Sequence, residues 1–182
     1  MKKRYLLLIY TLVLTLTGCD KLKELATVRI NTKIETEIPI VIAANLPSAA
    51  AFGENIHIPL TFSETHVIQL LDNFDIEPYL KKIKEIDLSE VEITALGMQP
   101  GQVINSVTLE VAGIGHILTL TNISSTNNTF KPTIPQSLLD AVASKFLNEE
   151  KITVTVYGSA NAPMSISVGV SIEAGIIAYV LE

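Results

Sequence analysis

The sequence predicts a mainly β protein, an antiparallel immunoglobulin-like β-sandwich of about seven strands with two short helices. Two patterns indicate this fold: apolar and polar residues alternate along several segments, and turn signals recur about every 8–12 residues. The composition agrees, because branched aliphatic residues and Thr dominate, Trp is absent and aromatic residues make up only 5%.

The clearest expected strand spans residues 28–42. Its even positions are all Val, Ile or Thr, and its odd positions from 29 to 37 are charged or Asn. A period of two predicts one buried and one exposed face, and Pro39 suits an edge strand or a bulge. Residues 43–55 indicate a loop. A second strand is expected next, with one face formed by Ile56, Ile58, Leu60 and Phe62.

The period changes over residues 75–85. Ile76, Leu80 and Ile83 are spaced four and three apart, acids come first and lysines last, and this predicts a short helix. A strand is expected over 86–96, with a bulge where its phase slips at Ser89-Glu90. Pro135 is expected to open a second helix with an apolar stripe. The other expected strands are 103–111, 117–123, 151–157 and a long final strand, 165–181.

The N-terminal residues have the composition of an export signal. Three basic residues, Lys2 to Arg4, precede an apolar run that ends at Leu16 and is too short to span a bilayer. The end of this run and the three residues after it, Leu16-Thr17-Gly18-Cys19, resemble the lipobox of bacterial lipoproteins. Cys19 is the only cysteine in the sequence. The resemblance implies cleavage before Cys19 and its lipidation, with palmitate as an acyl group. We therefore expect a signal peptide over 1–18, a lipidated tether over 19–26 and a single sandwich domain over 27–182.

The charge balance restricts the partners. From Cys19 onward the chain has ten Lys and Arg against 19 Asp and Glu, a formal charge of −9. This balance argues against nucleic acid as an electrostatic partner. The expected location is the cell envelope, with the lipid at Cys19 holding the chain on a membrane, and the outer membrane is favoured.

Two later segments carry a second resemblance. Tyr79-Leu80-Lys81-Lys82-Ile83-Lys84-Glu85-Ile86 runs from the expected helix into a strand, and Val154-Thr155-Val156-Tyr157-Gly158 is followed by Ala162-Pro163. These elements are similar to those of uncharacterised envelope lipoproteins of Bacteroidota-type bacteria, over roughly the last hundred residues. The resemblance implies a β-sandwich and carries over no functional residue.

No constellation in the sequence predicts catalysis, a cofactor or a metal site. The three histidines, His57, His66 and His116, are isolated, with His66 on an expected loop. The carboxylate pairs Asp72/Asp75 and Asp87/Glu90 adjoin the expected helix, where solvation and first-turn charge account for them.

Three further short features of the sequence are given only limited interpretations. Residues 72–77 weakly resemble a calcium loop, without its central Gly and terminal Glu. Gly113-Ile114-Gly115 is interpreted as a turn. Asn122 and Asn127 locate an exposed loop that could serve as a binding surface.

The sequence therefore favours a noncatalytic, membrane-anchored binding or scaffold module for a protein or glycan partner. The alternative is a carrier of an apolar ligand or lipid. Small residues on one face of the last strand, against which a ligand could lie closely, encourage that alternative: Ser165, Ser167, Gly169 and Ser171.

Overall fold

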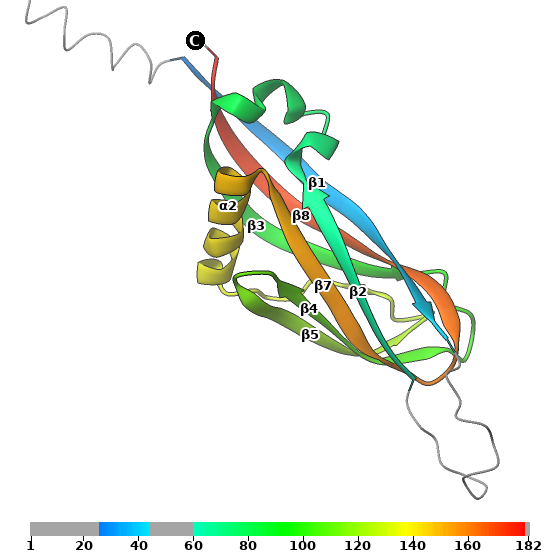
Figure 1. The fold of residues 1–182 in the computed structure, drawn as a ribbon. Helices are drawn as coiled ribbons and strands as arrows, with labels where there is room; N and C mark the ends of the chain where they lie inside the picture. Colours follow the sequence, from blue (N-terminus) through cyan, green and yellow to red (C-terminus); the bar gives the residue numbers. More distant parts are fainter. Residues whose placement is uncertain (1–25, 44–59, 181–182) are drawn as a thin grey trace, which may run out of the picture.

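The structure is a computed structural model that describes residues 26–43 and 60–180. It is mainly β, with two antiparallel sheets packed face to face, so the predicted β-sandwich is confirmed (Figure 1). Within the described ranges, no helix has the length and apolarity needed to cross a membrane. Several expected features lie outside the described residues: the signal, Cys19 with nearly all of the tether, most of the loop over 43–55, His57, and Ile56 and Ile58 of the second strand.

The strands and helices follow the chain in this order: β1 (Thr27–Ile42), β2 (Leu60–Gln69), η1 (Leu70–Asp72), η2 (Glu77–Lys82), β3 (Ile83–Leu96), β4 (Val103–Val111), β5 (Gly115–Ser124), β6 (Thr129–Phe130), α2 (Gln136–Glu149), β7 (Lys151–Ala160) and β8 (Met164–Tyr179). The two η elements are short 3-10 helices, and α2 is the one α-helix of the described ranges.

The strand order gives the sandwich a specific topology. One sheet has the order β1-β8-β3-β6 and the other the order β2-β7-β4-β5. Successive strands alternate between the sheets except for β4 and β5, which pair with each other. The last two strands return to the middle of the sheets, β7 between β2 and β4 and β8 between β1 and β3. Eight strands in this order form a jelly roll of two Greek keys. In an immunoglobulin sandwich, by contrast, the first two strands are neighbours in one sheet.

The alternation of apolar and polar residues in the sequence matches the alternation of buried and exposed side chains along β1 and β8. The two strands pair without interruption from Thr27↔Tyr179 to Ile42↔Met164, and their even-numbered residues face the core. Ile38, Ile40 and Ile176 are almost fully buried. Pro39 lies on the edge strand β1, where a missing N–H costs no ladder hydrogen bond.

The expected bulge in β3 is present, because the pairing with β8 shifts register between Leu88 and Val91. The expected helix over 75–85 is shorter than its periodicity indicated. Only Glu77–Lys82 is helical, as a 3-10 helix, and β3 already begins at Ile83. Pairing of Ile83 with Ala178 of β8 takes this residue into the sheet and ends the helix.

The two ends of the sandwich differ in what they carry. At one end the described chain begins and ends, and the Val180 N–H donates to the Ala26 carbonyl at 2.7 Å. η1 and η2 also lie there, next to α2, which covers one side between the sheets (Figure 1). At the other end lie the connections β3–β4, β5–β6 and β7–β8, and β1 ends and β2 begins there. The 16 residues of β1 separate the two ends by about 50 Å.

Candidate functional site

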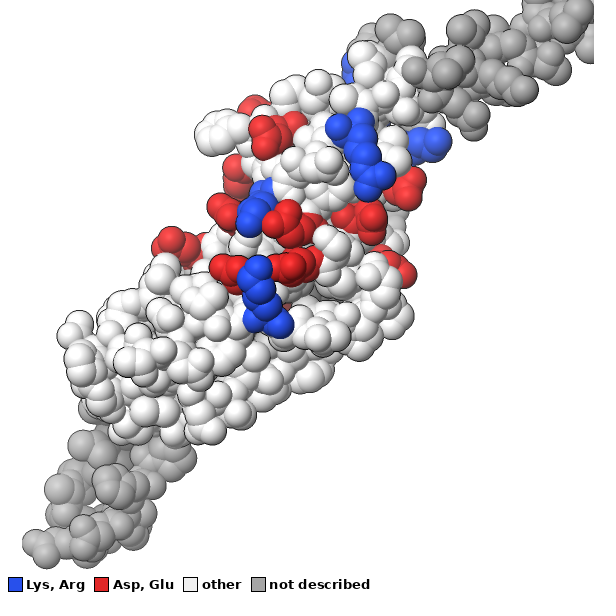
Figure 2. Space-filling model, turned by 180° about the vertical axis from the view of Figure 1, so that it is seen from behind, with Lys and Arg blue, Asp and Glu red and all other residues white. Residues whose placement is uncertain are grey.

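The end of the sandwich remote from the termini contains no charged residue in the described ranges. We call this region the uncharged end and define it as connections 97–102, 125–128 and 161–163 with the strand ends that flank them. Charges stop at Glu37 and Glu92 in one sheet and at Glu64 and Glu110 in the other. Figure 2 shows the result on one face, where the Lys, Arg, Asp and Glu of the described residues gather in the half near the termini and none of them lies in the other half.

This distribution departs from that of an ordinary surface. Soluble domains carry about 25% charged residues overall, and this chain carries 18%. Residues 93–109, 111–130 and 152–172 nevertheless contain no Asp, Glu, Lys or Arg. Sequence reasoning did not identify this site, although these three stretches were its signal. They become one surface only because the jelly roll brings them to the same end.

Amide side chains fix the connections of the uncharged end to one another. Asn161 Oδ1 accepts from the Val103 N–H at 2.8 Å, and Asn161 Nδ2 donates to the Gly101 carbonyl at 3.1 Å. Gln102 Nε2 donates to the Pro163 carbonyl at 3.3 Å. These bonds join the β3–β4 and β7–β8 connections, so the surface they form is held in one shape.

The neighbouring β5–β6 connection is tied to β3. Asn128 Nδ2 donates to the Ala95 carbonyl at 3.2 Å, and the Ala95 N–H donates to the Asn128 carbonyl at 2.8 Å. Asn122 and Asn127 are exposed, as the sequence predicted for this loop. The loop therefore belongs to the uncharged end and is one part of a wider surface.

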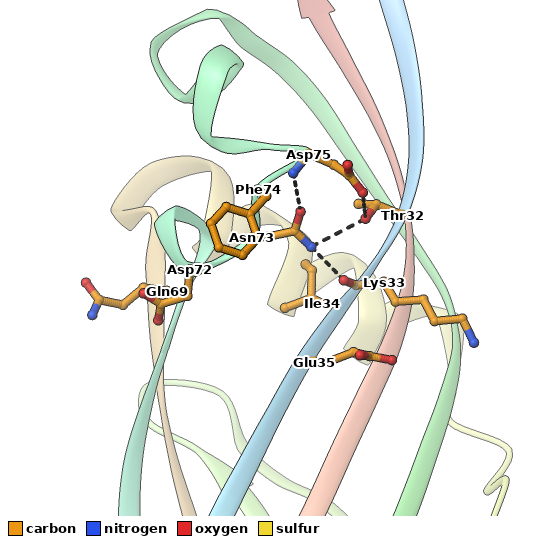
Figure 3. Close-up of a pocket in the computed structure, with 9 residues that line it drawn as sticks. All are labelled: Thr32, Lys33, Ile34, Glu35, Gln69, Asp72, Asn73, Phe74 and Asp75. Carbon is orange, nitrogen blue, oxygen red and sulfur yellow. Dashed lines mark hydrogen bonds between the residues drawn. The ribbon is translucent and has the colours of Figure 1, made fainter.

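A cleft of about 540 Å³ lies beside β1 in the charged half of the molecule (Figure 3). Asn73 organises it: its Nδ2 donates to the Lys33 carbonyl at 2.6 Å, and its Oδ1 accepts from the Asp75 N–H at 3.0 Å. Thr32 Oγ1 donates to Asp75 Oδ2 at 2.8 Å. Phe74 is 88% exposed. The Asn73 side chain thus provides a hydrogen bond to the Lys33 carbonyl on the edge of β1, which could otherwise pair with another strand.

The carboxylates singled out from the sequence do not converge. Figure 3 shows the Asp75 side chain directed at Thr32, whereas that of Asp72 lies on the Gln69 side of the cleft. The segment over 72–77 therefore does not place its carboxylates around one point. No group of three or more His, Cys, Asp or Glu that could hold a metal ion occurs within 26–43 and 60–180.

The second carboxylate pair is divided between two cations. Asp87 lies 4.0 Å from Arg29, and Glu90 accepts a hydrogen bond from Lys131. The Lys131 hydrogen bond and charge lower the pKa of Glu90 below its ordinary value. Lys131 also lies 3.4 Å from Glu92. Each carboxylate of this pair thus has a nearby cation in an exposed ion pair.

The described histidines lie apart in the fold. His66 is in β2 and not on a loop as expected, because residues 60–69 all pair with β7. Its Nε2 lies 3.1 Å from Thr36 Oγ1, a contact between the two sheets. His116 is the second residue of β5, and its Nε2 lies 3.0 Å from Thr119 Oγ1. Each ring thus has a local hydroxyl partner.

Two further concavities bear on the hypothesis that the protein carries an apolar ligand. One lies over the face of β8 with small residues, and the other lies between the sheets. A shallow trough of about 490 Å³ crosses the outer face of β1, β8 and β3 above Gly169, and Glu35, Glu37 and Glu92 line it. Ser171 Oγ donates to Glu35 Oε1 at 3.2 Å. Between the sheets, beside α2, lies an entirely apolar cavity of only about 30 Å³.

Comparison with known proteins gives fold-level likeness alone. No protein-family model matches the sequence, and no curated protein matches it. The decameric BFDV capsid protein is similar in structure, with a TM-score of 0.42 and 7% identity over 83% of this chain and 99% of that chain. Desmodium yellow mottle tymovirus gives a TM-score of 0.34 and 9% identity over 84% and 91%.

A third similar structure is that of infectious bursal disease virus, Gx strain, with a TM-score of 0.29 and 12% identity. It covers 84% of this chain and 37% of that one. At these TM-scores the likeness supports no conclusion about function.

Proposed function

We propose that this chain is a lipid-anchored lipoprotein of the bacterial cell envelope, on the outer membrane, and that its sandwich is a noncatalytic module that binds a partner through the uncharged end. The lipobox at residues 16–19 supports the anchor. Seven positions separate Cys19 from Ala26, a reach of at most about 25 Å. The anchor therefore holds the terminal end of the sandwich near the membrane, and the uncharged end is the one farther from it.

The uncharged end is the observation that carries the binding role. Charged residues are depleted at the centres of interfaces, where their desolvation is costly. A surface held in one shape by hydrogen bonds such as those of Asn161 loses little conformational entropy on binding. Among the described residues, depletion of charge and a fixed shape coincide at this end.

The remaining features favour a binding module over an enzyme or a carrier. The carboxylates at 72, 75, 87 and 90 have local structural partners or point apart. Ligand pockets measure about 300–1,000 Å³, whereas the apolar cavity between the sheets measures about 30 Å³. The two larger concavities have carboxylates in their walls, which an apolar ligand would have to desolvate.

The anchor is tested with Cys19→Ser in the full chain. The substitution should release the protein from the membrane fraction, and the mass of the N-terminal peptide of the unchanged protein should include acyl chains on Cys19. A Cys19→Ser variant that stays in the membrane fraction, or an unmodified Cys19 in the unchanged protein, would contradict the anchor.

The binding role is tested by a matched pair of charge insertions. Ser165 is exposed at the uncharged end and Ser89 is exposed in the charged half. In gently solubilised envelopes the unchanged lipoprotein should migrate on native gels in a species heavier than the monomer. Ser165→Lys should shift it to the monomer and Ser89→Lys should not. Equal behaviour of the two variants would argue against a partner at the uncharged end.

A further inference from the structure

Three of the four sheet edges in the described part of the chain carry features that hinder pairing with another strand. β1 contains Pro39, and Asn73 donates to one of its carbonyls. Next to β3 lies β6, only two residues long, and Gln136 of α2 donates to the Leu88 carbonyl at 3.2 Å. β2 carries an inward-facing charged residue, Glu64. The fourth edge is β5.

β5 has no such protection over residues 118–121. Neither a charge nor a proline occurs there, and within the described ranges this stretch pairs with β4 alone. Its outer backbone N–H and C=O groups are therefore open to a further strand. A register shift beside Leu118 and the left-handed backbone of Asn122, with a φ of 55°, limit the regular stretch to these four residues. β5 is also the edge opposite β2, away from the strand that follows residues 44–59.

This stretch, Leu118-Thr119-Leu120-Thr121, complements itself in antiparallel register. When Leu120 lies opposite Leu120 of a second copy, Thr119 lies opposite Thr121 of that copy. Both threonines are exposed, and Thr–Thr pairs across strands are favourable. Leu120 is only partly buried on the core, so the pairing would cover its remaining surface. Leu118 is already buried, which favours a register centred on Leu120 over one centred on Thr119.

Charge restricts where this acidic chain can meet its own copy. From Cys19 onward the formal charge is −9, so two copies repel each other except where the contact is uncharged. Residues 111–130, which include all of β5, contain no Asp, Glu, Lys or Arg. A two-fold axis brings the same patch of both copies together, and an uncharged strand that complements itself meets that requirement.

We infer that β5 pairs with β5 of a second copy of this chain, antiparallel and about a two-fold axis at Leu120, so that two four-stranded sheets become one eight-stranded sheet. This contact goes beyond the proposed function, because it lies on a sheet edge beside the uncharged end and has a different partner. Four residues form few hydrogen bonds, so the pair dissociates on dilution and is not expected on dilute native gels.

The symmetry of the pair determines how two copies face each other. An axis normal to the sheet reverses the strand direction, so the long axes of the copies point in opposite directions. The terminal ends then lie about 70 Å apart, because Leu120 is four residues from the uncharged end of a body about 50 Å long. If each copy is anchored at Cys19, as proposed above, the contact bridges two facing membrane surfaces.

Cysteine pairs in the full lipoprotein test the register. Directly opposite residues have Cβ atoms about 4.5–5.5 Å apart, which small shifts bring into disulfide range. In concentrated detergent solution under mild oxidation, a mixture of Thr119→Cys and Thr121→Cys should give at least fivefold more disulfide-linked dimer than either variant alone. Ser89→Cys and the unchanged protein are the controls and should remain monomeric. No dimer from the mixture, or equal yields from the mixture and the single variants, would overturn the pairing.

Clustering of phosphatidylcholine vesicles that carry the full lipoprotein tests the opposed arrangement. Light scattering should rise at least twofold with the unchanged protein and with Ser89→Lys, and should stay at the level of bare vesicles with Thr119→Lys. Disulfide-linked dimers without clustering would overturn the bridging of two membranes. Failure of the protein to float with the vesicles would contradict the anchor instead, and the response of the native complex to Ser165→Lys tests the uncharged end independently.

Discussion

Among the described glycines, Gly158 has the least room for a Cβ, and its replacement by Ala gives a sharp test of the fold. A Cβ there would lie 1.9 Å from the Ser106 carbonyl oxygen of β4 and 3.0 Å from Cζ of Phe62 in β2. Ordinary contact begins at 3.4 Å, so β4 must move by about 1.5 Å. The obstacle is backbone rather than a flexible side chain, and β4 is paired on both edges. We expect Gly158→Ala to cost about 3 kcal/mol, the upper part of the range for overpacking.

Gly169→Ala is the matched control, because it is the same substitution in another inner strand. A Cβ at Gly169 meets its nearest neighbour, the Thr94 carbonyl oxygen, at 3.6 Å, an ordinary contact. Adding a Cβ at a compatible position stabilises a protein by about 0.4–1 kcal/mol through the unfolded chain. Gly169→Ala should therefore melt at or slightly above the temperature of the unchanged protein.

Thermal unfolding followed by circular dichroism measures the difference. For a domain of this size about 1 kcal/mol corresponds to roughly 2–4 °C, so Gly158→Ala should lower Tm by about 6–12 °C. Equal melting temperatures for the two variants would refute the close approach of β7 to β4 and, with it, the strand order of this sheet.

Three further outcomes are expected. Phe146→Ala removes a fully buried α2 side chain and should cost about 3–5 kcal/mol in urea unfolding, whereas Leu147→Ala, at a residue 39% exposed, should cost less than about 1 kcal/mol. Asn73→Ala deletes the 2.6 Å bond to the edge of β1 and should cost about 1–2 kcal/mol in the same assay; no loss would argue that this contact is absent in solution. The hydrogen bond to Glu110 raises the pKa of Tyr157, so Glu110→Gln should lower it in an NMR titration of the ring; an unchanged titration would contradict the contact. Because the folded-state pKa is raised, any stability from this bond is present below the ordinary tyrosine range and lost as pH rises through the raised value.

Local alternation made most of the strands predictable. β1 and β8 follow from a strict period of two, because each has one face against the core along its whole length. The bulge near Ser89 followed from a slip in that phase. The helix expected over 75–85 is shorter in the structure than predicted. Residues such as Ile83 suit a short helix and a strand equally, and pairing with β8 decides between the two.

Features that depend on long-range pairing were not predictable. The jelly-roll order places β8 between β1 and β3, a contact between opposite ends of the chain that no local pattern specifies. His66 was expected on a loop, yet it lies in β2, on an inner face beside Thr36 of the other sheet. The uncharged end was visible only as three separate uncharged stretches until the topology brought them together.

Site-specific photo-crosslinking in the intact envelope tests the central claim most directly. A photoreactive residue would replace Thr126, exposed at the uncharged end, or Ser89, exposed in the charged half, in otherwise unchanged lipoprotein. The account predicts a discrete, slower-migrating adduct from position 126 and none from position 89. Adducts only from position 89, or the same products from both positions, would contradict a binding surface at the uncharged end.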